Sequence, residues 1–321
     1  MSQIPAGYSI RPAELSDLEA VTGVAVACDL LDWGTAAVEA QDILDDWHRP
    51  SFDLSRDSVV VTTEGEEVVA YSFVIDEREH AELESWGAVH PAHRDRGLGT
   101  LVLGRIEDRA REHAALAQEG RTMFRTTVAS VDRAAVELVR SRGFIRARTW
   151  WFMERELDRS FQTVVPPPGV RIEPLVVGRD EREVHGVMEE AFSEHWGFVP
   201  TSFDEWRRQN LDRPGFDPSL WLLAREEEQL VGAALGTTRL DKGWVSDLGV
   251  LRPWRGRGIA STLLHRLFAE FARRGYRKVG LGVDSQNDTG ATALYEKVGM
   301  RAVHQFGRYE KELRAEGSPS G

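Results

Sequence analysis

The sequence predicts two consecutive copies of one α+β domain, each built around a mixed β-sheet. Three observations support this fold class. The chain has 321 residues, a length that suggests about two domains. Four landmarks recur in one order at a nearly constant offset, and each recurring block contains the same succession of β-rich and helical segments.

The internal repeat extends over most of the chain, with an offset of 156 to 162 residues. Its landmarks are GYSIRPAELSD (7–17) with GVRIEPLVVGRD (169–180), VHPAHRDRGLG (89–99) with VLRPWRGRGIA (250–260), RGF (142–144) with VGM (298–300), and FMEREL (152–157) with RYEKEL (308–313). Because this period is too long for a solenoid, each copy is expected to have its own core.

The elements follow the same order in both copies. In the first copy we expect a strand at 8–13, helices at 15–28 and 36–47, and strands in SVVVTT, EVVAYSFVI and ELESWGAV. In the second we expect a strand at 170–175, helices at 180–193 and 202–211, and strands in LWLLAR, QLVGAALGTTR and GWVSDLGVL. An amphipathic helix, a fifth strand, another helix and a last strand pair then complete each copy, ending at 157 and 313.

These patterns give the domain boundaries. We expect a first domain at 1–157 and a second at 170–314, joined by the linker 158–169. Three successive prolines in this linker favour an extended, semi-rigid segment. The tail 315–321 is expected to be disordered.

Composition and charge restrict the class of protein. A net charge of −12 argues against nucleic acid and anionic membrane surfaces as partners. The single cysteine, Cys28, excludes an intrachain disulfide framework and a cysteine-rich zinc site, and no motif predicts another metal site. No signal peptide and no apolar run of about 20 residues is found. A cytoplasmic location is therefore expected, and the oligomeric state stays open.

Arginines and glycines gather where a strand ends and a helix begins, in RGRGIA (255–260) and RDRGLG (94–99). The N-terminus of a helix binds anions through its free N–H groups and the positive end of its dipole. Glycine permits close approach and a positive φ, and arginine offers forked donors to phosphate oxygens. The pattern differs from the Walker A and dinucleotide-binding motifs. It indicates a pyrophosphate site, with a solvated turn as the alternative.

The same residues resemble a known family. Arg255-x-x-Gly258-x-Ala260 and Arg94-x-x-Gly97-x-Gly99 resemble motif A of the GNAT superfamily of N-acetyltransferases, Q/R-x-x-G-x-G/A, and NDTGATALYEKVGM (287–300) resembles the motif that follows it. The chain thus resembles a tandem GNAT protein, an arrangement that mycothiol synthase shares. The resemblance implies acetyl-CoA as the cofactor and the amine of a small molecule as the acceptor.

The resemblance also implies a set of cofactor-binding residues in the second copy. The pyrophosphate is expected on Arg255, Gly256, Arg257, Gly258, Ile259 and Ala260, and the pantetheine arm between strands at roughly 244–250 and 278–283, with Asn287 as a hydrogen-bonding partner. An ordinary helix N-cap is the alternative for Asn287. Backbone N–H groups at Leu248, Gly249 and Val250 are expected to polarise the thioester carbonyl.

The expected chemistry is direct attack of the amine on the thioester. By resemblance, Tyr295 is the acid that protonates the departing thiolate, since a phenol with an ordinary pKa of about 10 stays protonated at pH 7. The base is less defined: some family members have a glutamate where our alignment places Trp244, and the nearby candidates are Asp247, Glu194 and His195. Ordered water is an alternative route for the proton.

An aromatic-rich stretch lies where family members cover the acceptor. It contains Phe192, Trp196, Phe198 and Trp206, which either line the acceptor or belong to an ordinary core. In the first copy Val139 stands where Tyr295 stands in the second, and Asp132 replaces the asparagine. We therefore expect the first copy to be catalytically degenerate, although Arg94, Gly97 and Gly99 preserve its loop.

Two alternatives to a general small-molecule N-acetyltransferase are open. One is an enzyme similar to mycothiol synthase, against which Trp244 counts. The other is a non-catalytic acyl-CoA-binding sensor or scaffold, against which Tyr295 counts, because a protein that only binds has no chemical need for that phenol.

Overall fold

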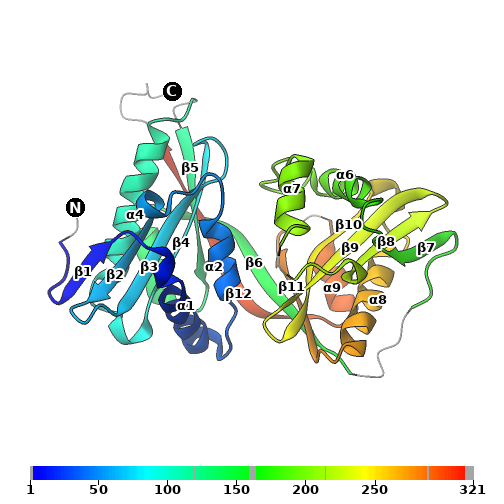
Figure 1. Cartoon of the computed structure of the whole chain (residues 1–321), viewed down its shortest axis with the longest axis horizontal. Coiled ribbons are helices and arrows are strands. Elements are labelled where there is room, and N and C mark those ends of the chain that lie inside the picture. The colour runs from blue at the N-terminus through cyan, green and yellow to red at the C-terminus, as the bar shows by residue number, and fades with distance from the viewer. Residues whose placement is uncertain (1–2, 119–120, 159–163, 214, 288, 315–321) are drawn as a thin grey trace. The chain divides into compact units, whose positions relative to one another are not determined.

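The chain forms two compact α+β units, which a computed structural model describes at residues 3–118, 121–158, 164–213, 215–287 and 289–314 (Figure 1). Unit 1 comprises residues 1–150 together with 304–321, and unit 2 comprises 151–303. The linker residues 159–163 and the tail 315–321 lie outside the described residues, so the predictions for them stay predictions.

Unit 1 has a mixed sheet in the order β1-β2-β3-β4-β5-β12, in which only β4 and β5 run parallel. Its elements are β1 (Tyr8–Arg11), α1 (Leu18–Trp33), α2 (Ala40–Trp47), α3 (Leu54–Asp57), β2 (Ser58–Thr63), β3 (Val68–Asp76), β4 (Glu82–Val89), α4 (Leu98–Ala114), β5 (Arg121–Ala129), α5 (Arg133–Ser141) and the first half of β6 (Ile145–Glu156).

Unit 2 repeats this plan in the strand order β6-β11-β10-β9-β8-β7, with β10 and β11 parallel. Its elements are β7 (Val170–Pro174), α6 (Glu181–Phe192), α7 (Phe203–Asn210), β8 (Trp221–Glu226), β9 (Gln229–Arg239), β10 (Lys242–Val250), α8 (Ile259–Arg273), β11 (Lys278–Asp284), α9 (Ala291–Lys297) and the start of β12 (Arg301–Arg314).

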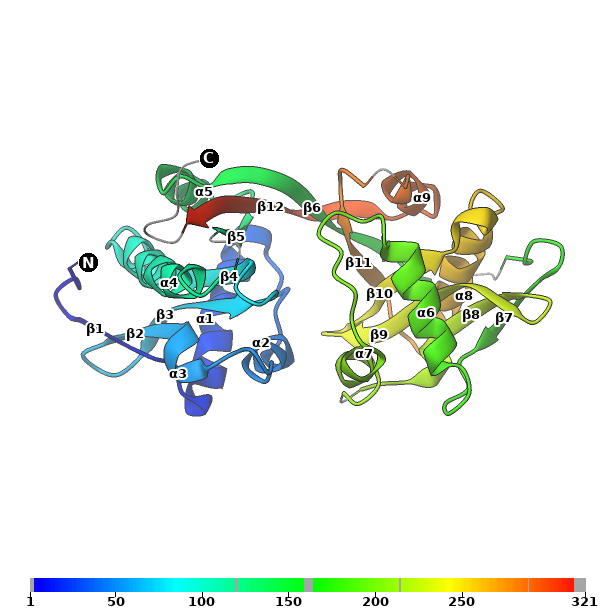
Figure 2. The same ribbon diagram turned by 90° about the horizontal axis from the view of Figure 1, so that it is seen from above.

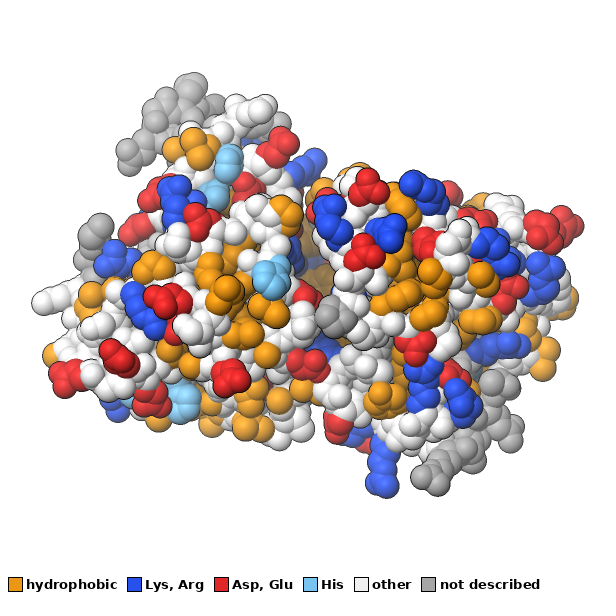
Figure 3. Space-filling view, in the orientation of Figure 1, with side chains coloured by type: hydrophobic (Ala, Val, Ile, Leu, Met, Phe, Trp, Pro, Cys, Tyr) orange, Lys and Arg blue, Asp and Glu red, His pale blue; other side chains and the backbone are white. Residues whose placement is uncertain are grey.

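Helices cover both faces of each sheet. In unit 2 the apolar side of α8 packs on one face in a core that includes Leu263, Leu267 and Phe271, while α6 packs on the other through Val184 and Met188 (Figure 2). Unit 1 has α4 on one face and α1 with α2 on the other. On the face drawn in Figure 3, acidic and basic side chains are interspersed over both units.

The terminal strands are exchanged between the two copies of the repeat. Met153 and Leu157, at the end of the first copy, are buried in the core of unit 2. Tyr309 and Leu313 occupy the equivalent positions of the second copy and are buried in the core of unit 1, where β12 pairs with β5. The compact units therefore differ from the sequence boundaries 1–157 and 170–314 at these two strands, because each strand completes the sheet of the other copy.

The predicted element order agrees with the observed one except at two places: the last strand pair expected in each copy is a single strand, β6 in the first copy and β12 in the second, and α3 was not predicted. The strands expected at SVVVTT, ELESWGAV and QLVGAALGTTR have the observed bounds, and the other elements differ by a few residues at their ends. The differences are largest at the first helix, which begins at Leu18 after a 3₁₀ turn and continues to Trp33. Gly34, with φ 75°, ends it in a left-handed conformation.

Candidate active site

Strands β10 and β11 diverge in the middle of the unit 2 sheet. They are paired only where residues 243–245 face 279–281, although β10 continues to Val250 and β11 to Asp284. A bulge between Val245 and Asp247 interrupts the pairing of β10 with β9 at the same level. The extra residue, Ser246, reverses the alternation of the side chains, so that Asp247 faces α6 instead of the core beneath α8.

Backbone N–H groups face the opening between these strands. Leu251 donates its N–H to Val231 O on the β9 side at 3.0 Å. Because N–H groups alternate along a strand, those of Leu248 and Val250 point away from β9, towards the side where β11 has diverged. Gly249 faces α6, where an added Cβ would lie 2.9 Å from Met188 Sδ. Of the three predicted carbonyl donors, Leu248 and Val250 therefore have the suitable direction.

The loop after β10 leaves open space at its glycines. Gly256 and Gly258 have φ of 77° and 85°, in the left-handed region, and Gly258 is the N-cap of the 15-residue helix α8. An added Cβ would have no neighbour within 4 Å at Gly256, and only Pro167 Cγ at 4.0 Å at Gly258. The loop and the first turn at Ile259 and Ala260 thus form an uncovered helix N-terminus that can accept an anion.

The two arginines of this loop have protein partners. Arg255 donates to Val250 O at 3.0 Å and to Ala191 O at 3.1 Å, and thereby joins the end of β10 to the last turn of α6. Arg257 forms an ion pair with Glu226, which also accepts a hydrogen bond from Trp254 Nε1 at 2.7 Å. Sequence reasoning missed Glu226. The direct phosphate role predicted for these guanidinium groups therefore stays a prediction, and Arg255 has a positioning role in the structure.

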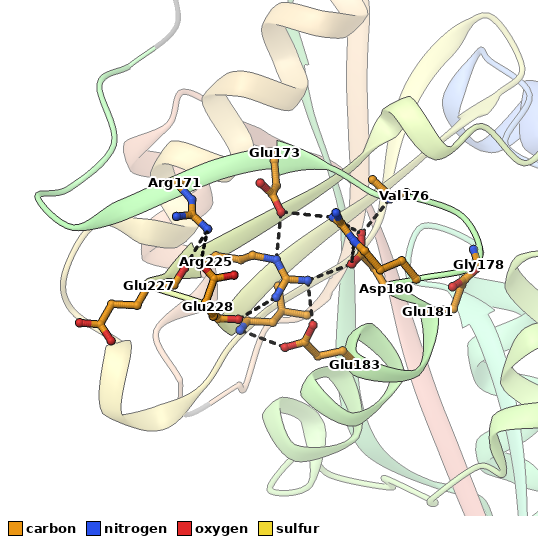
Figure 4. Close-up of polar contacts among 12 residues, drawn as sticks. Arg171, Glu173, Val176, Gly178, Asp180, Glu181, Glu183, Arg225, Glu227 and Glu228 are labelled. Atoms are coloured by element: carbon orange, nitrogen blue, oxygen red, sulfur yellow. Dashed lines mark hydrogen bonds and ion pairs between the residues drawn. The ribbon is translucent and has the colours of Figure 1, made fainter.

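The N-terminal end of α6 is held by a second arginine, Arg225 of β8, whose side chain is buried (Figure 4). Arg225 donates to Glu173 at 3.0 Å, to Asp180 at 3.0 Å and to Glu183 at 2.7 Å. Asp180 in turn accepts from Val176 N–H at 2.8 Å. Together, Arg225 and Arg255 fix both ends of α6 against the sheet face that carries Asp247.

Asp247 and Tyr295 form an electrostatically coupled pair. Burial raises the pKa of the Asp247 carboxyl to about 6. Burial and the nearby Asp247 charge raise the pKa of Tyr295 to about 12. Among the described residues, no hydrogen bond or ion pair reaches either side-chain oxygen. At pH 7 the site thus combines a carboxylate that is ready to accept a proton with a phenol that retains its own.

The other two candidates for the base lie beside the loop. Glu194 is exposed and pairs with Arg252 at 3.0 Å and with Arg255 at 3.5 Å. His195 packs edge-on against Phe192 with 4.6 Å between ring centroids, and burial together with the Arg255 charge lowers its pKa, so its imidazole is neutral at pH 7. Neither residue is electrostatically coupled to Tyr295 in the way that Asp247 is.

The remaining predicted residues have local roles. Asn287 accepts from Thr289 N–H at 2.8 Å in its own turn, whereas the N-cap of α9 is Gly290, so the N-cap alternative for Asn287 is wrong. Trp206 is buried in the α6 core, with 5.7 Å between its ring and that of Trp221. Of the predicted aromatic acceptor wall, Phe192 also packs against this core, while Trp196 and Phe198 are half-buried.

The first copy preserves the glycine and arginine pattern of the loop, but these residues have other neighbours than in the second copy. Gly97, with φ 80°, is the N-cap of α4. A Cβ added at Gly99 would lie 3.2 Å from Leu138 Cδ2, so this glycine has little free space. Arg94 pairs with Asp132 at 3.2 Å. Cys28 donates its thiol proton to Val89 O at 3.2 Å, and burial raises the pKa of this thiol, as expected of a packed cysteine.

Comparison with known proteins identifies the family. The acetyltransferase (GNAT) family model matches residues 25–144 and 184–300. The chain belongs to this family. A mycothiol acetyltransferase from Saccharopolyspora erythraea is 29% identical over 261 residues, covering 79% of this chain and 84% of the relative. Another from Thermobispora bispora is 30% identical over 219 residues, covering 66% and 70%.

Solved structures agree over nearly the whole chain. A GCN5-related N-acetyltransferase from Sphaerobacter thermophilus has a TM-score of 0.84 at 33% identity and covers 97% of this chain and 98% of its own. A tandem GNAT protein from the clavulanic acid biosynthesis pathway has a TM-score of 0.75 at 16% identity, covers 98% and 100%, and supports the fold alone. The predicted tandem GNAT fold and the acetyl-CoA-dependent N-acetyltransferase activity are thereby confirmed.

Proposed function

We propose that unit 2 transfers the acetyl group of acetyl-CoA to the amine of a small molecule, and that unit 1 is catalytically inactive. The observation that carries this proposal is the electrostatic effect of Asp247, on the part of β10 beyond its pairing with β11, on Tyr295 of α9. The Asp247 carboxylate, with a pKa of about 6, can accept a proton near neutral pH, and the Tyr295 phenol, with a pKa of about 12, can donate one.

The loop fits the proposed cofactor. The open space at Gly256 and Gly258, together with the first N–H groups of α8, provides a seat for a pyrophosphate made of backbone donors. Ile259 and Ala260 supply part of that first turn. Arg257 can add a donor by exchanging its partly exposed pair with Glu226 for phosphate.

When bound, acetyl-CoA supplies an acetyl group activated as a thioester. In the proposed reaction Asp247 accepts a proton from the acceptor ammonium, which leaves a neutral amine able to attack. Leu248 and Val250 N–H groups donate to the carbonyl oxygen on which negative charge develops. With acetyl-CoA bound, Tyr295 would give its proton to the departing sulfur and regain one from the nitrogen through solvent, and Asp247 would release to solvent the proton that it had accepted.

A second, narrower candidate is the reaction of the relatives named mycothiol acetyltransferase. The two relatives reported above carry that name at 29% and 30% identity. Trp244 occupies the strand position at which the family resemblance implies a glutamate in some members, and its ring lies 5.3 Å from that of Phe152. The acceptor is therefore proposed only as a small-molecule amine.

Two further expectations concern insertion into a membrane and location in the cell. Within the described ranges no helix is both long and apolar enough to cross a bilayer. The expected cytoplasmic location stays a prediction.

The test measures thiol release from acetyl-CoA in the presence of a panel of small amines, with the mycothiol precursor included. Asp247→Asn should lower the turnover number by roughly 10²-fold or more, the range of general-base effects. Asp241→Asn is the matched control, because Asp241 is an exposed carboxylate at the β9–β10 turn. Equal rates in these two variants would contradict the role given to Asp247.

A further inference from the structure

Three side chains of unit 1 bring potential metal ligands together at one end of its sheet. His80 Nδ1 lies 2.6 Å from Asp76 Oδ2 and 2.9 Å from His113 Nδ1. His113 Nδ1 is 3.8 Å from the same carboxylate oxygen. Asp76 ends β3, His80 belongs to the β3–β4 turn, and His113 lies in the last turn of α4. The three ligand atoms all lie within 4.8 Å of one another.

Surrounding groups orient each of these ligands. Asp76 Oδ1 accepts from the N–H groups of Arg78 and His80 at 3.1 and 2.8 Å, which leaves Oδ2 facing the two imidazole rings. His113 Nε2 lies 3.4 Å from Asp57 Oδ1, and this oxygen also accepts from Arg109 at 2.7 Å. A proton on His113 Nε2 leaves the lone pair of Nδ1 directed into the cluster.

The turn that carries His80 has an unusual backbone. Glu79 and His80 have φ of 42° and 69°, in the left-handed region that non-glycine residues enter at a cost. His80 O also accepts from Thr122 Oγ1 at 2.6 Å, which ties the turn to β5. The fold therefore holds this imidazole over Asp76 and His113 against a local conformational preference.

From this geometry we infer that Asp76, His80 and His113 bind a divalent transition metal, with Zn²⁺ as the best match. Two imidazole nitrogens and one carboxylate oxygen are a frequent zinc ligand set, completed by water as the fourth ligand. The carboxylate behind His113, from Asp57, has the outer-shell position that fixes a metal-binding histidine. His80 is 30% exposed and gives the ion a path from solvent, whereas His113 and Asp57 are buried.

The close spacing is compatible with this ion. In a tetrahedral site with bonds of about 2.0–2.1 Å, neighbouring ligand atoms are about 3.3 Å apart, so His80 has to move outward by roughly 0.4 to 0.7 Å from its separations of 2.9 Å from His113 and 2.6 Å from Asp76. That ring belongs to an exposed turn. The bound ion joins the β3–β4 turn to the end of α4 and stabilises unit 1, without any part in the transfer reaction of unit 2.

The test titrates the full-length protein, previously treated with EDTA and dialysed, with ZnCl₂ in an isothermal calorimeter, and follows its thermal unfolding with and without zinc. The wild type should bind one zinc per chain and should unfold at a higher temperature with zinc present. His80→Gln and Asp76→Asn should each weaken binding by more than about tenfold and abolish the thermal shift. His48→Gln, at an exposed histidine of the same unit, should match the wild type.

Two results would overturn the inference. One is the absence of zinc binding in a wild-type protein that circular dichroism shows to be folded. The other is zinc binding and a thermal shift that persist unchanged in both His80→Gln and Asp76→Asn, which would place the ion on other surface groups. Binding of CoA by unit 2 is measured separately and is unaffected by either result.

Discussion

The two copies have one backbone plan and differ in the polarity of the space between their diverging strands. In unit 2, β10 presents Asp247 opposite Leu235 after a bulge. In unit 1 the corresponding residue of β4 is Trp86, opposite Phe73 in an unbroken register, and its ring lies 6.5 Å from that of Phe73. An indole thus fills the position in the first copy that a desolvated carboxylate has in the second.

The loops before α4 and α8, and the helices α5 and α9, also differ at positions proposed for cofactor binding and catalysis. At the position of Gly256 the first copy has Asp95, which keeps the left-handed conformation, with φ 61°, but adds a carboxylate to the anion seat. The position of Tyr295 is taken by Val139, which is buried in an apolar cluster. On the proposed assignment, the first copy keeps the strand–loop–helix framework without its chemistry, because the framework needs glycine geometry and packing, whereas proton transfer needs specific polar side chains.

The largest expected effect distinguishes the two loops. Gly258→Glu should abolish acetyl-CoA binding and activity, because a carboxylate would occupy the anion seat of the copy that we propose to be active. Gly97→Glu introduces the same side chain at an N-cap with nearly the same φ, 80° against 85°, and should retain most of the activity. Calorimetric titration with acetyl-CoA and a rate assay check both. Loss of activity in Gly97→Glu with intact folding would assign a role to the first loop.

Next in size is the effect of the phenol. Tyr295→Phe should lower the turnover number by roughly 10²-fold while the affinity for acetyl-CoA stays near that of the wild type. Tyr276→Phe is the control, since this tyrosine packs beside Phe271 in the same core. Steady-state rates at saturating substrate are the measurement. Similar rates for the two variants would show that Tyr295 only fills space.

The pH profile sharpens the assignment of the base. In the proposed reaction the ionised form of Asp247 is the active one, so kcat/KM should rise with pH through about 6. Tyr295, with its pKa raised to about 12, should cause no decline below pH 10. Asp247→Asn should lose the acidic limb and keep only the rise that is due to the amine itself. A limb near pH 6 that survives in this variant would assign it to another group, with His195 the first candidate.

The smallest effect concerns stability. The folded-state pKa of Asp247 lies above its unfolded value, so ionisation destabilises the folded state progressively from about pH 4 to pH 6. Asp247→Asn should therefore raise the free energy of unfolding at pH 8 by about 1–2 kcal/mol, a gain that disappears near pH 4. Urea denaturation at both pH values measures it. A less stable variant at pH 8 would mean that the carboxylate is not desolvated as described.

Much of the fold could be predicted because β-branched runs and glycine-marked helix starts are local signals. The bulge at Ser246 could not, since it depends on how β10 pairs with β9 and leaves no mark in the local pattern. The exchange of β6 and β12 was also out of reach, because FMEREL and RYEKEL fit either sheet equally well.

Only part of the site could be predicted, because local motifs mark some of its residues but not the partners that lie far along the chain. Motifs located the loop and Tyr295, but the partners of Arg255 and Arg257 are far along the chain, at Ala191 and Glu226. The cluster of Asp76, His80 and His113 had only one sequence signal, a spacing of four residues between the first two. Such a spacing is common without a metal, and the third ligand depends on where α4 ends.

The exchange of β6 and β12 has an evolutionary consequence. Each copy supplies the other with a strand, as in a domain-swapped dimer whose two chains have been fused into one. Deletion of the first copy would remove Met153 and Leu157 from the core of unit 2, where truncating each such side chain costs about 2–5 kcal/mol. Selection can therefore preserve the first copy for the strand that it supplies, even though the proposal gives it no catalytic role.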